Sequence, residues 1–304
     1  MTTLVSINGV IHRPEDAKIS VFDHGFLFGD SIYEVLRTYE GELFMFDAHL
    51  ARLHQSAAYL SLTLPVSDRV LLNWCLEAVK AAANTESYVR LIITRGAGAI
   101  SLNPATAAQP QVLFYVKPYE PYPAHLYREG CMATVSTVRR NDPKALNPSA
   151  KTGNYVNSML ALMEGLHFGA TEAIMLNGEG LLTEGTTSNL CLVRDGVVHT
   201  PSADSGILQG ITRTLVGEGC NLLGITLTHG RYPKNDLLTA DEAFFCSTLK
   251  DVLPISRVYD VAQDRWTTVG NGGVGPVSAR LSACWPEVVT ALRRRFPPGH
   301  TVTE

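Results

Sequence analysis

Several short stretches of the chain are apolar runs, and pairs of these runs are joined by Asn-Gly, Gly-Glu-Gly or Asp-Gly. Such residues adopt the positive φ angles that tight hairpin turns require. The pattern therefore predicts β-hairpins at 4–12, 174–184 and 190–200. At least part of the sheet structure is expected to be antiparallel.

Other stretches repeat apolar residues every three or four positions, which is the spacing of one helix face. In 46–60, a stripe of leucine and alanine leaves Arg52 outside it, and Asp47 is expected to cap the helix. Four further helices are marked by a cap, a closing glycine or an internal proline: one after Ser67, one closing on Gly169, one closing on Gly224, and one near 278–295 interrupted by Pro286.

A break is predicted at Lys-Pro-Tyr-Glu-Pro-Tyr-Pro, because three closely spaced prolines suit an extended connector. We expect a small N-terminal α/β domain at 1–117, a linker at 118–123 and a larger C-terminal domain at 124–304. A length of 304 residues is sufficient for two domains. Strands and helices mix on both sides of the break, so the predicted fold class is α/β with α+β character.

Composition narrows the classes of function. The 25 basic and 29 acidic residues are nearly balanced and form no basic patch, so nucleic acid is not an expected partner. The six cysteines have no paired spacing, and no apolar run approaches a membrane span of about 20 residues. We therefore expect a soluble cytoplasmic protein with reduced thiols and no membrane partner. The nine histidines show no metal-ligand spacing, so no metal is expected. Ser188 is not in a hydrolase motif, so a serine hydrolase is not expected either.

Lys151 is the first candidate for chemistry. It lies among small residues in Ser-Ala-Lys-Thr-Gly, before a predicted helix. Desolvation there would disfavour its ammonium form and make it a nucleophile toward carbonyls. An ordinary surface lysine in a loop is the alternative interpretation.

A candidate anion site lies at 206–215, where a loop turns into a helix. Gly210, Ile211 and Thr212 stand at the helix start, where free N–H groups and a hydroxyl suit a phosphate. A helix that merely begins at a glycine would show the same pattern.

Two strand ends carry polar residues that suit a cofactor. Glu184 lies where a strand ends among small polar residues, and a carboxylate there could pair with a protonated ring nitrogen. Ser247 and Thr248 end an apolar strand and offer hydroxyl groups. A solvated turn and a plain strand exit are the alternatives.

Two segments could receive a substrate carboxylate. Phe28 precedes Tyr33 and Arg37, which stand at a helix-like spacing, and Tyr88 and Arg90 share one face of a predicted strand. Arginine is the natural bidentate partner of a carboxylate. An exposed sheet face would carry similar residues.

Together these segments resemble the class IV (fold type IV) pyridoxal-phosphate aminotransferases. That family includes branched-chain aminotransferases, D-amino acid aminotransferases and aminodeoxychorismate lyases. The resemblance covers nearly the whole chain and rests on DHGFLFGDSIYEVLR, HLARLHQSA, YVRLIITRG, AKTGNYVNSMLA, LLTEGTTSNL, ILQGITR and CSTLKDVLP.

The resemblance implies a two-domain fold type IV enzyme with a mixed sheet in its C-terminal domain. It implies that the catalytic Lys151 forms a Schiff base with pyridoxal 5′-phosphate and that Tyr155 binds the phenolic oxygen of the cofactor. Glu184 would keep the pyridine nitrogen protonated, and Leu208 would pack on the ring. The phosphate would be held by residues of three segments: Arg52, Ile211, Thr212 and Thr248. Gly210 and Ser247 are expected among the cofactor-binding residues beside them.

The substrate is implied less directly. Tyr88, Arg90 and Arg37 resemble the branched-chain branch, with 2-oxoglutarate or glutamate as partner, and Phe28 and Tyr33 would enclose an aliphatic side chain. Val35 and Tyr33 look more like D-amino acid aminotransferases, so a D-amino acid or (R)-amine transaminase and a 4-amino-4-deoxychorismate lyase stay open. A catalytically silent binding protein is a further alternative. The family also implies a homodimer or a higher homo-oligomer.

Overall fold

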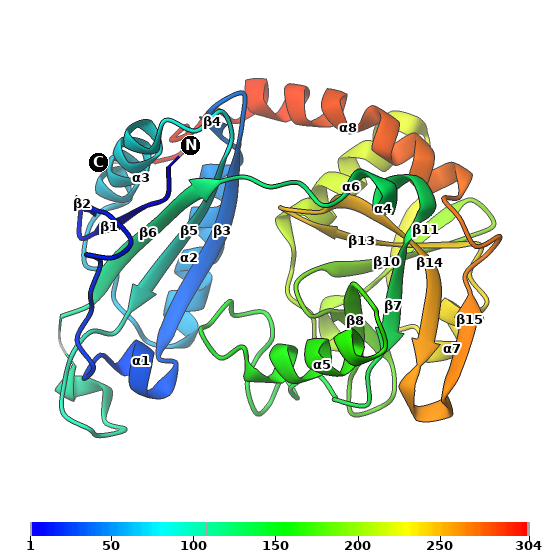
Figure 1. Cartoon of the computed structure of the whole chain (residues 1–304), viewed down its shortest axis with the longest axis horizontal. Coiled ribbons are helices and arrows are strands. Elements are labelled where there is room, and N and C mark those ends of the chain that lie inside the picture. The colour runs from blue at the N-terminus through cyan, green and yellow to red at the C-terminus, as the bar shows by residue number, and fades with distance from the viewer. Residues whose placement is uncertain (1, 108, 303–304) are drawn as a thin grey trace. The chain divides into compact units, whose positions relative to one another are not determined.

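Tertiary contacts divide the chain into two units, each built from more than one segment (Figure 1). The structure is a computed structural model that describes residues 2–107 and 109–302. Unit 1 comprises Met1–Glu120, Ala150–Asn154 and Ala291–Glu304; unit 2 comprises Pro121–Ser149 and Tyr155–Thr290. The domains expected at 1–117 and 124–304 contain one continuous segment each, whereas in the structure two later segments belong to unit 1.

The described part of unit 1 contains one antiparallel sheet of six strands in the order β2-β1-β6-β5-β3-β4. Its strands are β1 (Leu4–Ile7), β2 (Val10–His12), β3 (Ser31–Tyr39), β4 (Glu42–Leu43), β5 (Ser87–Thr94) and β6 (Gln111–Pro118). Helices α2 (Phe46–Tyr59) and α3 (Asp68–Ala82) pack on one face, and the short helices are α1 (His24–Phe28) and the 3₁₀ turn Pro104–Thr106. The core between sheet and helices includes Leu36, Leu53, Leu71, Leu91 and Phe114.

Unit 2 is a mixed sheet that closes on itself. Its nine described strands follow the order β12-β11-β10-β13-β14-β7-β8-β9, with β15 beside β14. Because β9 pairs with both β8 and β10, the strands β10, β13, β14, β7, β8 and β9 form a ring around an apolar core. The strands are β7 (Cys131–Val135), β8 (Glu172–Leu176), β9 (Leu182–Gly185), β10 (Asn189–Arg194), β11 (Val197–Pro201), β12 (Leu227–Gly230), β13 (Glu242–Ser247), β14 (Asp251–Asp260) and β15 (Arg265–Thr268).

The helices of unit 2 lie outside the ring of strands. Helix α5 (Val156–His167) packs on β8 and β7, α6 (Ile211–Leu223) packs on β13, and α4 (Ala124–Glu129) packs on β14. The others are α7 (Lys234–Leu238), α8 (Pro276–Arg295), whose residues from 291 on belong to unit 1, and the 3₁₀ turns Ala203–Ser205 and Val261–Gln263. Strand pairs β14–β7, β7–β8 and β11–β12 are parallel, which confirms the mixed fold class.

The three predicted hairpins are confirmed, since β1–β2, β8–β9 and β10–β11 are antiparallel neighbours. The helix predicted to close on Gly224 does so, with the glycine at φ 64°. Ser67 also precedes α3 as expected, although its side chain makes no capping hydrogen bond.

Three local predictions are wrong. Asp47 does not cap α2: Met45 holds that position, and Asp47 accepts hydrogen bonds from Gly299 N and Thr301 N at 2.7 and 2.6 Å. Pro286 does not interrupt α8, because it lies on the solvent side, where water can satisfy the carbonyl that loses its donor. The helix-like spacing of Tyr33 and Arg37 belongs to strand β3.

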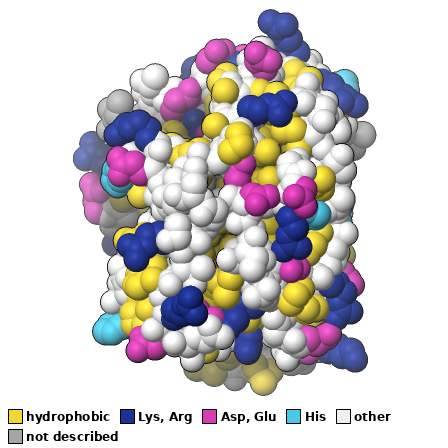
Figure 2. Space-filling view, turned by 90° about the vertical axis from the view of Figure 1, so that its right-hand side faces the viewer, with side chains coloured by type: hydrophobic (Ala, Val, Ile, Leu, Met, Phe, Trp, Pro, Cys, Tyr) yellow, Lys and Arg dark blue, Asp and Glu magenta, His cyan; other side chains and the backbone are white. Residues whose placement is uncertain are grey.

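The surface carries mixed charge. On the face seen in Figure 2, basic and acidic side chains are interspersed, so no field of one sign covers it. Across 2–107 and 109–302, no helix is both long and apolar enough to cross a membrane. The same residues contain no cluster of three or more His, Cys, Asp or Glu that could hold a metal.

Candidate active site

Lys151 is fixed by its backbone within unit 1. Its N–H donates to Ser56 Oγ of α2 at 3.0 Å, and its carbonyl accepts from Tyr33 N of β3 at 3.0 Å. Gly153 is needed beside it, because a Cβ there would stand 2.2 Å from Ser31 Oγ. The partly buried Lys151 side chain places Nζ 4.5 Å from the centre of the Tyr33 ring. This lysine is therefore held between a helix and a strand, unlike a lysine of a free surface loop.

The proposed substrate residues share one sheet face. The register pairs Val35 with Arg90 and Arg37 with Tyr88, and directly opposed residues of antiparallel strands point to the same side. Tyr33 has the same strand parity as Val35 and Arg37. All five face away from α2 and α3, whose core is built from the alternate residues of these strands. A spacing of four residues keeps Tyr33 and Arg37 on one side of a strand as it would in a helix.

Arg90 joins this face to Lys151 through Tyr33. Its Cζ lies 4.2 Å from the centre of the Tyr33 ring, the same ring that Lys151 Nζ contacts. Arg90 Nε is buried and has no hydrogen-bond partner among the described residues. A buried donor without a partner is costly, so its position suits an acceptor such as a carboxylate oxygen.

Arg37 is oriented by two aromatic rings. Its Cζ lies 3.9 Å from the centre of the Tyr39 ring and 3.8 Å from that of Tyr119. Such stacking fixes the plane of the guanidinium. Phe28 lies apart from the two strands, in α1, where its ring contacts His24 edge to face.

Arg52 forms a buried cluster with Glu34 and His49. Its Nε and Nη2 each donate to a Glu34 oxygen at 2.7 Å, and His49 Nδ1 lies 2.7 Å from Glu34 Oε2. Burial raises the pKa of Glu34, but Arg52 and His49 lower it to about 2. Burial also lowers the pKa of His49, which keeps the imidazole neutral. The expectation that Arg52 points away from the core face is wrong, because it is buried against the sheet through Glu34.

In unit 2, Glu184 is a buried carboxylate held by three donors. Arg140 Nε donates at 2.9 Å, the Leu208 backbone N–H at 2.9 Å, and Asn189 Nδ2 at 3.3 Å. The pairing of Glu184 with Asn189 is also the one that closes the ring of strands. The predicted residues Glu184 and Leu208 are thus brought together.

Asn189 also brings the start of α6 to this carboxylate. Its Nδ2 donates to the Leu208 carbonyl at 2.8 Å, and a Cβ at Gly210 would stand 1.9 Å from its Oδ1. Gly210 is the N-cap residue of α6, and no side chain accepts a capping hydrogen bond there. The N–H groups of Ile211 and Thr212 in the first turn can therefore donate to an anion.

The remaining cofactor candidates lie at strand and helix ends of unit 2. Ser247 ends β13 and Thr248 follows it, one and two residues beyond Cys246, which pairs with Asn189. Tyr155 is partly buried at the position before α5. Ser247 and Thr248 therefore belong to the strand end beside Asn189 and Glu184.

The sequence interpretation missed three residues that support this arrangement. Glu34 and Asn189 lie inside quoted segments and hold the predicted residues Arg52 and Glu184, while Arg140 lies in no quoted segment. Glu34 could have been noticed as a charged residue in an apolar strand. No local signal marks Arg140, whose partner is 44 residues away.

Comparison with known proteins decides the family. The family model described as amino-transferase class IV matches residues 31–258, a span that includes Arg52, Arg90, Lys151, Glu184 and Thr248. The chain belongs to the class IV aminotransferases.

Relatives of this class IV aminotransferase carry more than one activity. A putative branched-chain-amino-acid aminotransferase of Methanocaldococcus jannaschii is 33% identical, over 94% of this chain and 96% of the relative. An aminodeoxychorismate lyase of Bacillus subtilis is also 33% identical, over 85% and 87%. Among solved structures, the T.th. branched-chain amino acid aminotransferase with pyridoxamine 5′-phosphate is 32% identical, covers 99% of this chain and 98% of that chain, and has a TM-score of 0.89.

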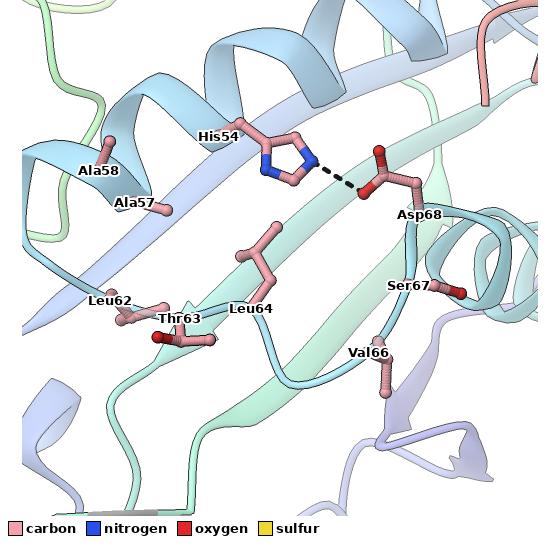
Figure 3. A pocket seen from close by; sticks show the side chains of 9 residues that line it. All are labelled: His54, Ala57, Ala58, Leu62, Thr63, Leu64, Val66, Ser67 and Asp68. Atoms are coloured by element: carbon pink, nitrogen blue, oxygen red, sulfur yellow. Dashed lines mark hydrogen bonds and ion pairs between the residues drawn. The ribbon is translucent and has the colours of Figure 1, made fainter. Parts of the chain in front are cut away.

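This class IV aminotransferase has a further hollow of about 530 Å³ in unit 1, away from the residues above. It lies between the end of α2 and the start of α3, where His54 Nε2 is 2.8 Å from Asp68 Oδ1 (Figure 3). Both side chains are substantially exposed, at 48% and 30%. Leu62, Leu64 and Val66 line it with apolar side chains. It is an open surface hollow, and none of the proposed cofactor or substrate residues lines it.

Proposed function

We propose that this class IV aminotransferase transfers the amino group of L-branched-chain amino acids to 2-oxoglutarate. The observation that carries the proposal is the shared contact of Arg90 and Lys151 with the ring of Tyr33. The cation that we propose for the carboxylate and the amine that we propose for the chemistry thus contact the same aromatic ring. The orphaned Nε of Arg90 supports a carboxylate ligand there.

The cofactor is pyridoxal 5′-phosphate. When bound, it supplies an aldehyde for an amine and a protonated ring that withdraws electrons from the substrate. In unit 1, Lys151 Nζ is the amine that binds it and that moves the proton to and from the substrate α-carbon. Arg52 binds the phosphate as a cation whose direction Glu34 fixes.

In unit 2, the donor set suits the ring and the phosphate of pyridoxal phosphate. Glu184 would hold the proton of the ring nitrogen, because Arg140, Asn189 and Leu208 N keep its carboxylate in place. Tyr155 would donate to the phenolic oxygen, and Leu208 would pack on the ring. The start of α6 and the end of β13 would supply the hydrogen bonds to the phosphate, from Gly210, Ile211, Thr212, Ser247 and Thr248.

The substrate residues bind two kinds of group. Arg90, Tyr88 and Arg37 receive the α-carboxylate and the distal carboxylate of glutamate, since bidentate arginine pairs are specific for carboxylates. Phe28 and Tyr33 enclose the aliphatic side chain of leucine, isoleucine or valine. Because glutamate and a branched-chain amino acid bind the same site in turn, the site needs cationic residues for the carboxylates and apolar residues for the aliphatic side chain.

Two alternative activities are each favoured by one observation. Tyr33 and Val35 favour a D-amino acid or (R)-amine transaminase, and the relative from Bacillus subtilis favours a 4-amino-4-deoxychorismate lyase. The test is a panel on purified enzyme: amino transfer to 2-oxoglutarate from L-leucine, D-alanine and (R)-1-phenylethylamine, and pyruvate release from aminodeoxychorismate. L-leucine should be the best donor, and a higher kcat/KM for any other compound rejects the proposal.

We also propose a homodimer that acts in the cytoplasm. Five apolar side chains of α5 are at least half exposed, which suits contact with a second copy of the chain: Val156, Met159, Leu160, Met163 and Leu166. All six cysteines are buried free thiols, as in a reducing compartment. Light scattering after gel filtration should give twice the mass of 33.1 kDa, and Met163→Glu should lower it. A wild-type mass of one chain would contradict the dimer.

A further inference from the structure

A buried ion pair joins two turns of unit 2, one that follows the strand of Glu184 and one that contains Thr248. Glu172, the first residue of β8, and Lys250, in the turn between β13 and β14, are 1% and 2% exposed. Lys250 Nζ donates to Glu172 Oε2 at 2.7 Å and to Thr187 Oγ1 at 2.6 Å. Neither residue belongs to the cofactor or substrate sets above.

Glu172 organises the turn that follows Glu184. It accepts hydrogen bonds from the Thr186 N–H at 3.0 Å, from the Thr186 hydroxyl, from Thr187 Oγ1 at 2.9 Å and from Ser188 Oγ at 3.1 Å. These three residues are the whole connection between β9 and β10. The Glu172 carboxylate thus accepts a hydrogen bond from each of the three residues that connect β9 to β10.

Lys250 ties the second turn to the first. It lies two residues after Thr248, and its carbonyl accepts from Tyr127 Oη at 3.1 Å, so both its backbone and its side chain are anchored. Burial lowers the pKa of Lys250, but the Glu172 carboxylate, together with Tyr122 and Cys131, outweighs burial and raises it. Burial raises the pKa of Glu172, and Lys250 with the hydroxyl groups lowers it to about 2. Both groups therefore stay charged, and this lysine is no competing nucleophile.

We propose that the Glu172–Lys250 pair is a positioning device that sets Glu184 and Thr248 for the cofactor. The inference rests on the proposed function, because it assumes that these two residues bind pyridoxal phosphate. A hydrophobic pair of similar volume would fill the same space without leaving a lone buried charge. It could not accept hydrogen bonds from the three hydroxyl groups, so the turn after Glu184 would lose the hydrogen bonds that hold it.

The test separates positioning from stability with three variants. Lys250→Met alone leaves a buried carboxylate without its cation, so it should lower the melting temperature and weaken pyridoxal phosphate binding. The double variant Glu172→Leu with Lys250→Met should be more stable than Lys250→Met alone, because it buries no lone charge, but should keep a dissociation constant about tenfold or more above wild type, a size typical of losing the support of a ligand-binding residue. Equilibrium dialysis with pyridoxal phosphate gives the constant.

A matched control is available in the same unit. Lys234 Nζ bonds Asp260 Oδ2 at 2.5 Å, away from both turns, so Lys234→Met should lower stability without changing cofactor affinity. The inference is overturned if the double variant binds pyridoxal phosphate as tightly as wild type, or if Lys234→Met weakens binding equally. Failure of the wild type itself to bind pyridoxal phosphate would instead reject the proposed function.

Discussion

Replacing Glu34 with glutamine should make the free energy of unfolding less dependent on pH in acid. The variant lacks the carboxyl that takes up about one proton when the wild-type chain unfolds. The native carboxyl is buried, which raises its pKa, but Arg52 and His49 bring it from 4.5 down to about 2. Above pH 4.5 the carboxyl is ionised in both folded and unfolded chains. As the pH falls toward 2, the unfolded chain takes up the proton first, so the native state loses its advantage.

The size of the effect follows from these two values. The lowered pKa stabilises the native state by about 3 kcal/mol at neutral pH, at about 1.4 kcal/mol per pKa unit. About 2 kcal/mol of this is lost between about pH 5 and about pH 3. Glutamine cannot ionise, so the variant should not show this loss. The variant should also be less stable at neutral pH by about 3 to 5 kcal/mol, because Arg52 becomes a buried cation without a charged partner.

Guanidinium unfolding followed by tryptophan fluorescence measures both quantities. Replacing Trp266 and Trp285 by phenylalanine in all samples leaves Trp74 of α3, which reports on unit 1. Glu42→Gln is the control, since Glu42 is 64% exposed in its pair with Arg293 and such pairs contribute at most about 1 kcal/mol. If wild type and Glu34→Gln lose equal stability between the two pH values, Arg52 does not hold Glu34 ionised and the reasoning fails.

Three further substitutions test the proposed roles. Lys151→Ala should lower the rate of amino transfer by a factor of about 10² to 10⁴ or more. Borohydride reduction of the wild type should fix the cofactor on Lys151, and a cofactor label on Lys250 would show that Lys151 is not the catalytic amine. Arg90→Ala should raise the KM for glutamate by about tenfold or more, and that for leucine less, because a charged hydrogen bond contributes about 1.5 to 3 kcal/mol; equal increases would refute a role at the distal carboxylate. Arg52→Ala should speed the loss of colour from the holoenzyme on dialysis, and unchanged retention would count against phosphate binding.

Features decided by neighbouring residues could be predicted from the sequence. The hairpins follow from turns such as Asn8-Gly9, which occupy positive φ, and α6 ends at Gly224 for the same reason. Tyr33 and Arg37 were assigned to one face correctly, but to the wrong element, because a spacing of four fits both a helix and a strand.

Features decided by distant partners could not be predicted. Asp47 looked like a helix cap, yet its partners lie more than 250 residues later along the chain. The Glu172–Lys250 pair spans 78 residues, and nothing near either residue signals the other. The pairing of Arg52 with Glu34 likewise depends on how α2 packs on β3. Burial and pairing of charges are tertiary properties, so local patterns leave them open.

The interrupted chain path of unit 1 has a consequence for its synthesis. Its first 120 residues leave the ribosome early, but the segment with Lys151 and the segment with Gly299 and Thr301 follow much later. Domains usually fold as units in the order of translation. Here all six described strands of unit 1 are made within the first 120 residues, but the segment from residue 291 that binds Asp47 follows unit 2, so a ribosome stalled before residue 291 would present unit 1 unfinished to chaperones.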